Sequence, residues 1–279
     1  MRIAELPWYD LPEVRVATDA WWRGLVGHLR RLGVDDVPDE LTRGGSHVER
    51  WQQRDLLLSQ SCGYDVLYDA AHAIVPIATP CYAAPGCEGP RYSSEVLVHA
   101  DAPFHTVEDL RGARAAVNEP TSHSGNNAMR PLVAARSERG AFFGEVVLTG
   151  SHATSLLLLQ NDKVDVACVD AVVLALLRRR RPLALHGLRT VARSTTAPAP
   201  PYVTSVHTPP SVRDHLREAL FAAVRDPQLA AARDELLLTD FVALPAEAYR
   251  ELQDWEHPAL IAGYRELPAP RRSPLSGGG

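Results

Sequence analysis

The chain has 279 residues, of which 46% are hydrophobic, so it is long enough to bury a sizeable core in one large domain or two lobes. Its formal net charge of -5 argues against general nucleic-acid binding, which needs a strongly basic face. The only dense basic run, 178–181, is interpreted as the solvated end of a helix. No segment approaches the roughly 20 apolar residues of a membrane span, so we expect a folded, soluble protein without membrane insertion.

The N-terminus and the cysteines bear on the compartment. The opening segment "MRIAELPWYDLPEVRV" has no apolar core of signal-peptide length, so the chain as written is expected to be cytoplasmic. A periplasmic or extracellular place is expected instead if a leader has been removed. Cys62, Cys81, Cys87 and Cys168 form no CxxC pair, so we expect thiols, no metal site and no cofactor. A Cys81–Cys87 disulfide remains an alternative for an exported protein.

Units of strand, loop and helix fill the first third of the chain. A strand is expected over 1–6, then a helix with apolar residues at helical spacing that stops at Gly33. Leu56–Leu58 predicts a second strand, which runs through a polar turn at 60–64 into another helix. The segments "AIVPIATPCY" and "SSEVLVHA" predict two further strands around a Pro/Gly-rich surface loop.

The same order of elements starts again after residue 105. A short helix, "TVEDLRG", precedes the strand "ARAAVNEP"; "GEVVLTG" and "VDVACVD" follow as strands, and each of the three ends in a polar loop that starts a helix. Such βα repeats build a parallel sheet with helices on both faces. Ligands of these sheets lie at the carboxyl ends of the strands, where the loops converge.

The remaining chain completes a two-lobed prediction. "LRTVARSTTAPAPPYVTSVHT" predicts two strands around a Pro-rich kink, the rest is mostly helical, and the tail 268–279 should be disordered. We expect the second series to be an insert, with lobe one at 1–102 plus 196–279 and lobe two at 103–195. Two chain crossings between the lobes would act as a hinge.

One polar segment, "EPTSHSGNNAMRPLVAARSERG" at 119–140, crowds hydroxyl and amide side chains at the start of an expected helix. Ser122 or Ser124 there satisfies the requirements of an ordinary helix cap. The same hydroxyls, together with free backbone amides, also suit a phosphate-like anion. Both interpretations are compatible with the segment alone.

The segment around this motif resembles a known family. "TVEDLRGARAAVNEPTSHSGNNAMRPLVA", followed by "VVLTGSHATSLLLLQNDKVDVACVDAVVLALL", is similar to the phosphate/phosphite/phosphonate-binding proteins of ABC transporters, which include the phosphonate-binding protein PhnD. The resemblance implies an α/β, two-lobed type II periplasmic-binding-protein fold with a ligand cleft between the lobes. It also implies a small anionic ligand and, if the protein is exported, ABC-transporter membrane subunits as partners. His123 departs from the pattern, because the family commonly has a hydroxyl residue there.

Strand ends and the resemblance together select the candidate ligand-binding residues. They are Ser122, His123, Ser124, Gly125, Asn126, His152, Asp170, Tyr9, Gln60, Tyr82 and Tyr92. His152 is matched to the family's ligand-contacting histidine, with a helix-start cap partner as the alternative. Asp170 is interpreted either as an acceptor for a protonated ligand or as an N-cap. If His123 faces the anion, binding should strengthen as the pH falls toward 6.

Three classes of function compete. The main hypothesis is that the protein binds a small phosphate- or phosphonate-like oxyanion without catalysis. The alternative is a cytoplasmic enzyme, of lyase or biosynthetic type, acting on a small anionic metabolite; chorismate dehydratase and the pyrimidine-forming thiamin enzymes show that the architecture implied by the resemblance can host chemistry. A regulatory module is the third. No catalytic residue is assigned, since no triad stands out, and Cys62 is either a thiolate at a helix start or a small buried hydrophobe.

Overall fold

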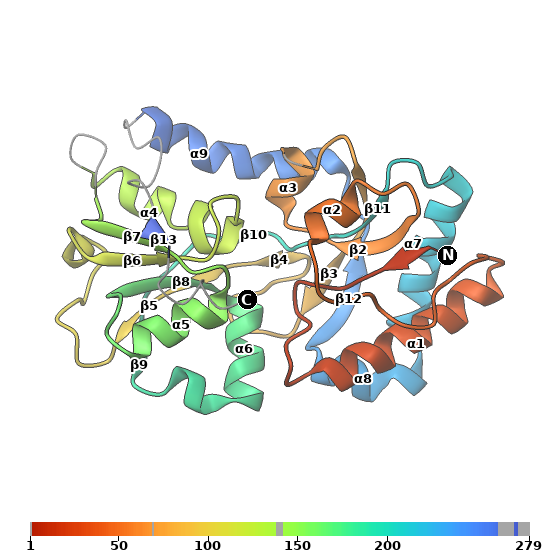
Figure 1. Cartoon of the computed structure of the whole chain (residues 1–279), viewed down its shortest axis with the longest axis horizontal. Helices are drawn as coiled ribbons and strands as arrows, with labels where there is room; N and C mark the ends of the chain where they lie inside the picture. Colours follow the sequence, from red (N-terminus) through yellow and green to blue (C-terminus); the bar gives the residue numbers. More distant parts are fainter. Residues whose placement is uncertain (1, 69, 138–141, 262–270, 273–279) are drawn as a thin grey trace. The chain divides into compact units, whose positions relative to one another are not determined.

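The structure is a computed structural model that describes residues 2–68, 70–137, 142–261 and 271–272. The chain divides into two compact units, shown in Figure 1. Unit 1 comprises residues 1–92 and 198–250, and unit 2 comprises residues 93–197 and 251–279. No helix in the described ranges combines the length and the apolar character that a membrane crossing requires.

Unit 1 is built on a mixed five-stranded sheet in the order β1-β2-β11-β3-β12. Its strands are β1 (Ile3–Ala4), β2 (Leu56–Gln60), β3 (Ile74–Tyr82), β11 (Tyr202–Ser205) and β12 (Leu238–Val242). The pair β1 and β2 is parallel, whereas β11 and β12 run antiparallel to their neighbours. All five residues of β2 are buried.

Helices cover this sheet. They are α1 (Arg15–Arg31), α2 (His47–Trp51), α3 (Gly63–Leu67), α7 (Pro210–Ala223) and α8 (Ala230–Glu235), with the 3₁₀ turns η4 (Pro227–Leu229) and η5 (Ala246–Arg250). Helix α1 buries Trp21, Trp22, Leu25 and Leu29, whose spacing places them on one face. Its end agrees with the prediction, because Gly33 follows with a φ of 77°, a conformation that glycine adopts without strain.

Unit 2 is built on a six-stranded sheet in the order β13-β7-β6-β8-β5-β9. Its strands are β5 (Ser94–His99), β6 (Arg114–Val117), β7 (Glu145–Leu148), β8 (Val166–Asp170), β9 (Leu188–Arg193) and β13 (Arg271–Arg272). The expected parallel series is present, since β6 pairs parallel with both β7 and β8. Strand β5 runs antiparallel to β8 and to β9.

Helices lie on both faces of this second sheet. They are α4 (Arg130–Ala134), α5 (His152–Gln160), α6 (Ala171–Arg180) and α9 (Glu251–Ile261), with the 3₁₀ turns η1 (Glu108–Leu110) and η3 (Pro182–Leu185) and a π-helical turn, η2 (His123–Asn127). Figure 1 shows α4 and α9 on one face and α5 and α6 on the other. A short two-stranded sheet of β4 (Arg91–Tyr92) and β10 (Ala197–Pro198) contains residues where the chain passes from one unit to the other.

The units differ from the predicted lobes in two places. Residues 93–102 belong to unit 2 because β5 is hydrogen-bonded to β8 and β9 on either side. Residues from 251 onward also belong to unit 2, because α9 packs against α4 and η2. The chain therefore passes between the units after residues 92, 197 and 250, instead of at the two crossings that were expected.

Some predicted elements are shorter than expected. The helix after the turn at 60–64 covers only Gly63–Leu67, and the expected helix "TVEDLRG" is the 3₁₀ turn η1. The predicted disordered tail, 268–279, lies outside the described residues except for Arg271 and Arg272, which pair with β7.

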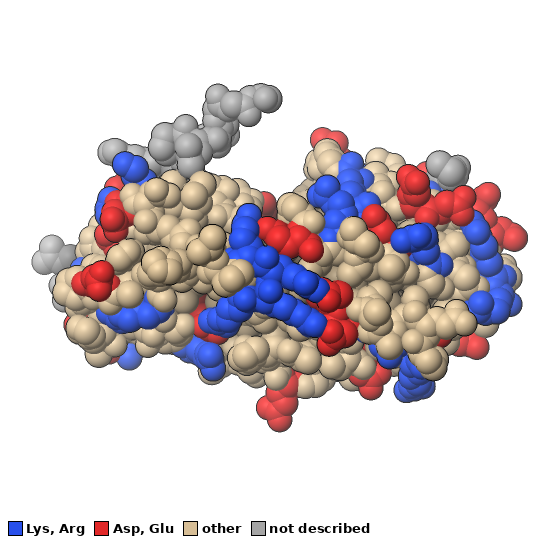
Figure 2. Space-filling view, turned by 90° about the horizontal axis from the view of Figure 1, so that it is seen from below, with Lys and Arg blue, Asp and Glu red and all other residues tan. Residues whose placement is uncertain are grey.

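Basic and acidic side chains are interspersed over the face shown in Figure 2. In the run 178–181, Arg178 reaches the buried carboxylate of Glu95 on β5, with Nη2 to Oε2 at 2.8 Å. Arg193 and the Thr190 hydroxyl bind the same carboxylate. Burial alone would raise the pKa of Glu95, but these partners hold it below its ordinary value. This part of the run therefore has a structural role in the sheet.

Candidate functional site

Polar residues collect at one edge of the unit 2 sheet. Since β6, β7 and β8 are parallel, the loops after Val117, Leu148 and Asp170 all leave from the same edge. Strand β5 begins there too, because Ser94 is paired with Asp170. The motif at 119–127, the start of α5 and the start of α6 are thereby brought to a common edge.

Residues His123–Asn127 of the motif form the π-helical turn η2. The Ser122 hydroxyl caps it by accepting a hydrogen bond from the Gly125 amide at 3.1 Å. The amides of Asn127 and Ala128 donate to carbonyls five residues earlier, which gives the turn its π-helical width. All five residues of η2 are buried. Capping is thus real here, but it uses Ser122 and leaves Ser124 for another contact.

That contact is with His152, the first residue of α5. The Ser124 Oγ lies 2.9 Å from His152 Nε2. Desolvation by burial lowers the pKa of His152 to about 4, so the imidazole is neutral at physiological pH. Ser151, and not His152, caps α5, because its hydroxyl accepts from the Thr154 amide. The cap-partner alternative for His152 is therefore not what the structure shows.

Several buried polar atoms at this edge have no hydrogen-bond partner among the described residues. They are the Nδ1 of His152, the Oδ1 atoms of Asn118 and Asn126, and the Oγ of Ser93. A buried polar atom without a partner costs about 1–3 kcal/mol, so such atoms are rare in folded proteins. Such atoms need a partner from outside the described chain, either ordered water or a polar ligand.

Gly125 is required at the centre of the turn. A Cβ at this position would lie 1.7 Å from the Asn118 Oδ1 and 3.3 Å from the His152 Cε1. Asn118 thus packs directly on the glycine backbone, next to the imidazole. The sequence reading missed Asn118 and Ser93, although Asn118 directly follows β6 and the strand-end rule would have found it.

His123 occupies a different environment from the expected one. Its ring lies 4.9 Å from that of Trp255 on α9, and the Asn127 side chain lies 3.3 Å from its Nδ1. It is 2% exposed, and burial lowers its pKa to about 3. Desolvation thus favours the neutral imidazole in the chain without a bound anion, and the stronger binding toward pH 6 expected of a His123 that faces the anion stays a prediction.

Asp170 acts as a helix cap, the alternative that the sequence offered. Its Oδ1 accepts from the amides of Val172 at 2.7 Å and Val173 at 3.2 Å. Asn126 also has an internal contact, since its Nδ2 donates to the Pro120 carbonyl. Both residues remain at the edge, but these atoms are already used within the fold.

Three of the four candidates in unit 1 come together. Tyr9, Gln60 and Tyr82 line a small cavity of about 20 Å³, enough for about one water molecule. The rings of Tyr9 and Tyr82 meet edge to face at 5.1 Å, and Gln60 Nε2 lies 3.3 Å from the Tyr82 hydroxyl. The sequence reading missed Tyr202, which lines the same cavity. Tyr92 is buried in β4 and is not among the residues that line it.

The cysteines are thiols, and three of the four are buried. Burial raises the pKa of Cys81 to about 11 and of Cys168 to about 12, which keeps both protonated. Cys62 precedes α3 as its N-cap and is 3% exposed. Within the described ranges, no three His, Cys, Asp or Glu side chains converge as a metal ion would require.

Comparison with known proteins now identifies the family. The model of the family described as "ABC transporter, phosphonate, periplasmic substrate-binding protein" matches residues 50–249. The chain belongs to this family. The phosphonates-binding periplasmic protein of Escherichia coli (strain K12) is 24% identical over 151 residues, or 53% of this chain and 45% of that protein. The match thus spans about half the length of this curated relative.

Solved structures share the fold. The binding protein component of an ABC phosphonate transporter (PA3383) from Pseudomonas aeruginosa superposes with a TM-score of 0.76 at 15% identity, covering 94% of this chain and 87% of that one. PhnD1 from Prochlorococcus marinus, in complex with methylphosphonate, superposes with a TM-score of 0.74 at 13% identity, covering 92% of this chain and 97% of that one. XAC2383 from Xanthomonas citri superposes with a TM-score of 0.70 at 16% identity, covering 94% of this chain and 98% of that one.

These neighbours confirm the predicted fold class, an α/β type II periplasmic-binding-protein fold with two lobes. At such low identities they bear on the fold alone. The candidate ligand residues therefore depend on the geometry within each unit, and the predicted ligand cleft between the lobes stays a prediction.

Proposed function

We propose that the chain is a solute-binding protein for a small phosphonate- or phosphate-like oxyanion, which the η2 turn and His152 hold at the edge of the unit 2 sheet. The observation that carries the proposal is the Ser124–His152 pair, surrounded by buried polar atoms that find no partner in the described part of the chain. Membership of the family and the methylphosphonate complex of PhnD1 support this ligand class. ABC-transporter membrane subunits are then its partners, in the periplasm or its equivalent.

The Ser124–His152 pair offers one hydrogen to an anion in either tautomer of the neutral imidazole. If His152 Nε2 carries the proton, it donates to Ser124 Oγ, and the hydroxyl hydrogen is left for the ligand. If Nδ1 carries the proton, the hydroxyl donates to Nε2 and the Nδ1–H is left instead. The Ser124 amide adds a donor, because the Gly125 amide is taken by the Ser122 hydroxyl and the Asn126 amide by the Ser122 carbonyl.

The unpartnered hydrogen-bond acceptors narrow the class of ligand further. The Oδ1 atoms of Asn118 and Asn126 are buried and can only accept hydrogen bonds. An oxyanion that carries its own proton, such as a hydrogen phosphonate, satisfies one of them, whereas a sulfonate of the same shape does not. We therefore expect phosphonate to be preferred over sulfonate.

The unit 1 group of Tyr9, Gln60 and Tyr82 is a second set of candidate contacts. It presents aromatic faces beside an amide and a phenol, which suits the organic part of a ligand better than its charged oxygens. Tyr82→Phe removes only the hydroxyl and tests whether this group takes part in binding.

A thermal-shift screen tests the proposal. Methylphosphonate, phosphite, phosphate, sulfate and methanesulfonate are compared, since a ligand that binds only the folded state raises the melting temperature by mass action. We expect a rise with at least one phosphorus oxyanion and little rise with methanesulfonate. No rise with any phosphorus oxyanion would contradict the proposal.

The enzyme alternative has one observation in its favour. A serine hydroxyl 2.9 Å from an imidazole is the arrangement of a nucleophile and its base. Against it, the low pKa of His152 makes a weak base, and its Nδ1 has no carboxylate partner within the described ranges. Phosphorus-31 NMR of a bound phosphonate ester decides, because turnover would produce a new resonance.

A further inference from the structure

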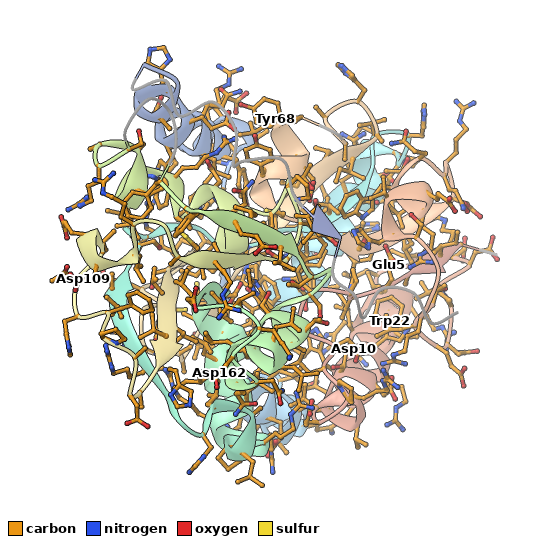
Figure 3. All side chains as sticks on the ribbon, turned by 60° about the vertical axis from the view of Figure 1, so that its left-hand side comes forward. Glu5, Asp10, Trp22, Tyr68, Asp109 and Asp162 are labelled. Atoms are coloured by element: carbon orange, nitrogen blue, oxygen red, sulfur yellow. The ribbon has the colours of Figure 1, made fainter. Side chains whose placement is uncertain are left out.

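We infer that unit 1 contains a second oxyanion site, formed by an arginine-lined cavity. The cavity has a volume of about 190 Å³ and is lined by the segment after β1, the start of α1, the loop 41–45 and α2. Its ionisable lining residues are Glu5, Asp10, Arg15, Arg43, His47 and Arg50. Figure 3 labels Glu5 and Asp10 in this part of the chain. None of these residues belongs to the η2 site, which lies in unit 2.

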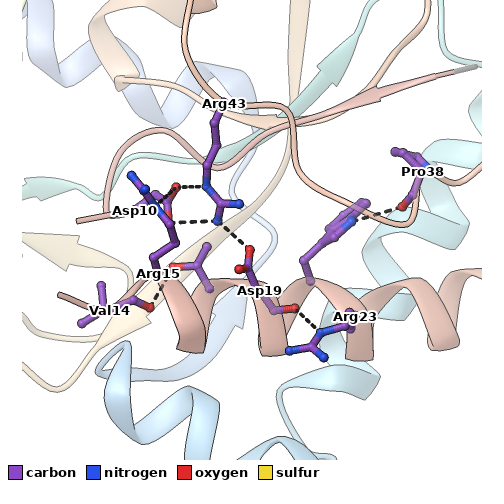
Figure 4. Close-up of polar contacts among 9 residues, drawn as sticks. Asp10, Val14, Arg15, Asp19, Arg23, Pro38 and Arg43 are labelled. Atoms are coloured by element: carbon purple, nitrogen blue, oxygen red, sulfur yellow. Dashed lines mark hydrogen bonds and ion pairs between the residues drawn. The ribbon is translucent and has the colours of Figure 1, made fainter. Parts of the chain in front are cut away.

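The acceptors of this cavity are already occupied. Glu5 is 1% exposed; its Oε2 accepts from Arg50 Nε, and its Oε1 accepts from the Ser59 hydroxyl at 2.8 Å. Asp10 accepts from Arg43 through both Nε, at 2.5 Å, and Nη2, at 3.2 Å. Figure 4 shows this fork, together with the further bond from Arg43 to Asp19. Neither carboxylate therefore needs another cation.

The donors, in contrast, are in surplus. Each guanidinium has five N–H groups. Arg15 makes one ion pair, from Nε to Asp10 at 3.9 Å, and its two terminal nitrogens contact no acceptor among the residues described. Arg50 uses Nε on Glu5 and Nη1 on the Gly44 carbonyl at 2.6 Å, which leaves Nη2. His47 lies against Trp8 and Trp51, and no hydrogen bond of its ring is found in the described ranges.

Unused donors and size fix the class of ligand. The lining holds three arginines and two carboxylates, and Asp19, which lies outside the lining, accepts from Arg43, so these charges balance and the preference for an anion comes from the unused N–H groups. Arginine forks match the geometry of carboxylate and phosphate oxygens. The volume of about 190 Å³ admits inorganic phosphate or a short carboxylate. The side chain of Arg15 is 51% exposed and marks the side open to solvent.

Such an anion would connect separate segments of unit 1. Arg15 starts α1, Arg43 lies in the loop before α2, and Arg50 lies within α2. An oxyanion bound by their unused N–H groups would hold these segments together. The site would thus act on the stability of unit 1, independently of any ligand at η2.

The test is a titration of inorganic phosphate into the full chain, followed by NMR of the backbone amides. We expect saturable shifts of Gly44, Gly45 and His47. Arg15→Gln removes the charge of a half-exposed side chain and should weaken this event at least tenfold. Arg23→Gln is the matched control, because Arg23 lies on the same helix but does not line the cavity.

Two outcomes would overturn the inference: no saturable shift of these amides in the wild type, or an unchanged affinity in Arg15→Gln. The Ser124→Ala variant separates the two sites. It should leave the cavity shifts in place while it weakens any event at η2, so a failure of one site is not mistaken for a failure of the other.

Discussion

Two polar loops at the same edge of the unit 2 sheet differ in how their hydrogen bonds are satisfied. At the start of α6, Asp170 accepts from two successive amides and closes the helix end. At η2, Ser122 closes the turn in the same way, but Ser124, His152 and Asn118 remain with polar atoms that are free for a ligand or unpartnered in the described ranges. A polar helix start is therefore a poor sign of a site by itself.

Among the variants proposed here, Gly125→Ala should lower the affinity for methylphosphonate the most. The added Cβ would lie 1.7 Å from the Asn118 Oδ1, so either the turn or Asn118 must move. We expect methylphosphonate affinity to fall roughly a hundredfold or more, as loss of two charge-assisted hydrogen bonds implies. The measurement is isothermal titration calorimetry.

Gly27→Ala is the control, because its nearest neighbour would be 3.6 Å away, at Arg31. Helix propensity predicts a slight gain in stability there and no change in affinity. Unchanged affinity in Gly125→Ala would remove the turn from the site.

The second prediction concerns pH and the buried His123. Its pKa is about 3 in the folded protein and about 6.5 when unfolded, so below pH 6.5 the unfolded state binds more protons and stability falls with falling pH. The loss from this residue is roughly 2 kcal/mol at pH 5. His123→Phe should reduce the difference in unfolding free energy between pH 7 and pH 5, measured by urea denaturation. An unchanged difference would show that His123 is not buried as described.

The third prediction concerns the start of α6, where Asp170 caps the helix. Asp170→Ala removes the acceptor for two amides at the start of α6, and the unfolding free energy should fall by about 1–2 kcal/mol, as for a lost helix cap. Affinity for methylphosphonate should stay the same. If the variant instead binds as weakly as a Ser124 variant, then Asp170 contacts the ligand, as the sequence offered.

Whether the sequence could predict a feature of this site depends on how far apart in the chain the contacting residues lie. The strand-end rule placed Ser122, Ser124 and His152 at one edge, because the order of strands and helices fixes which loops converge. Tyr9, Gln60 and Tyr82 were selected from the ends of strands and the edge of a turn, which needs only local pattern and topology. The choice of Ser122, Ser124 and His152 as ligand contacts depended also on the resemblance to the family.

The environment of His123 was not predictable in that way. Its partner, Trp255, lies in α9, and nothing in the pattern around either residue shows that α9 packs on unit 2. The same long-range packing moved the last part of the chain from the expected lobe one to unit 2. Asp170 was ambiguous for another reason, since a carboxylate at a helix start suits a cap and a ligand equally well in sequence.

The most direct test of the account is calorimetric titration of methylphosphonate into the wild type and Ser124→Ala at pH 7. Ser124 is the one residue of the turn whose side chain reaches His152 instead of serving as a cap. We predict saturable binding to the wild type and an affinity roughly tenfold to a hundredfold lower in the variant, the effect of one charge-assisted hydrogen bond. Equal affinities in the two proteins would contradict the account and leave η2 as a capped turn like the start of α6.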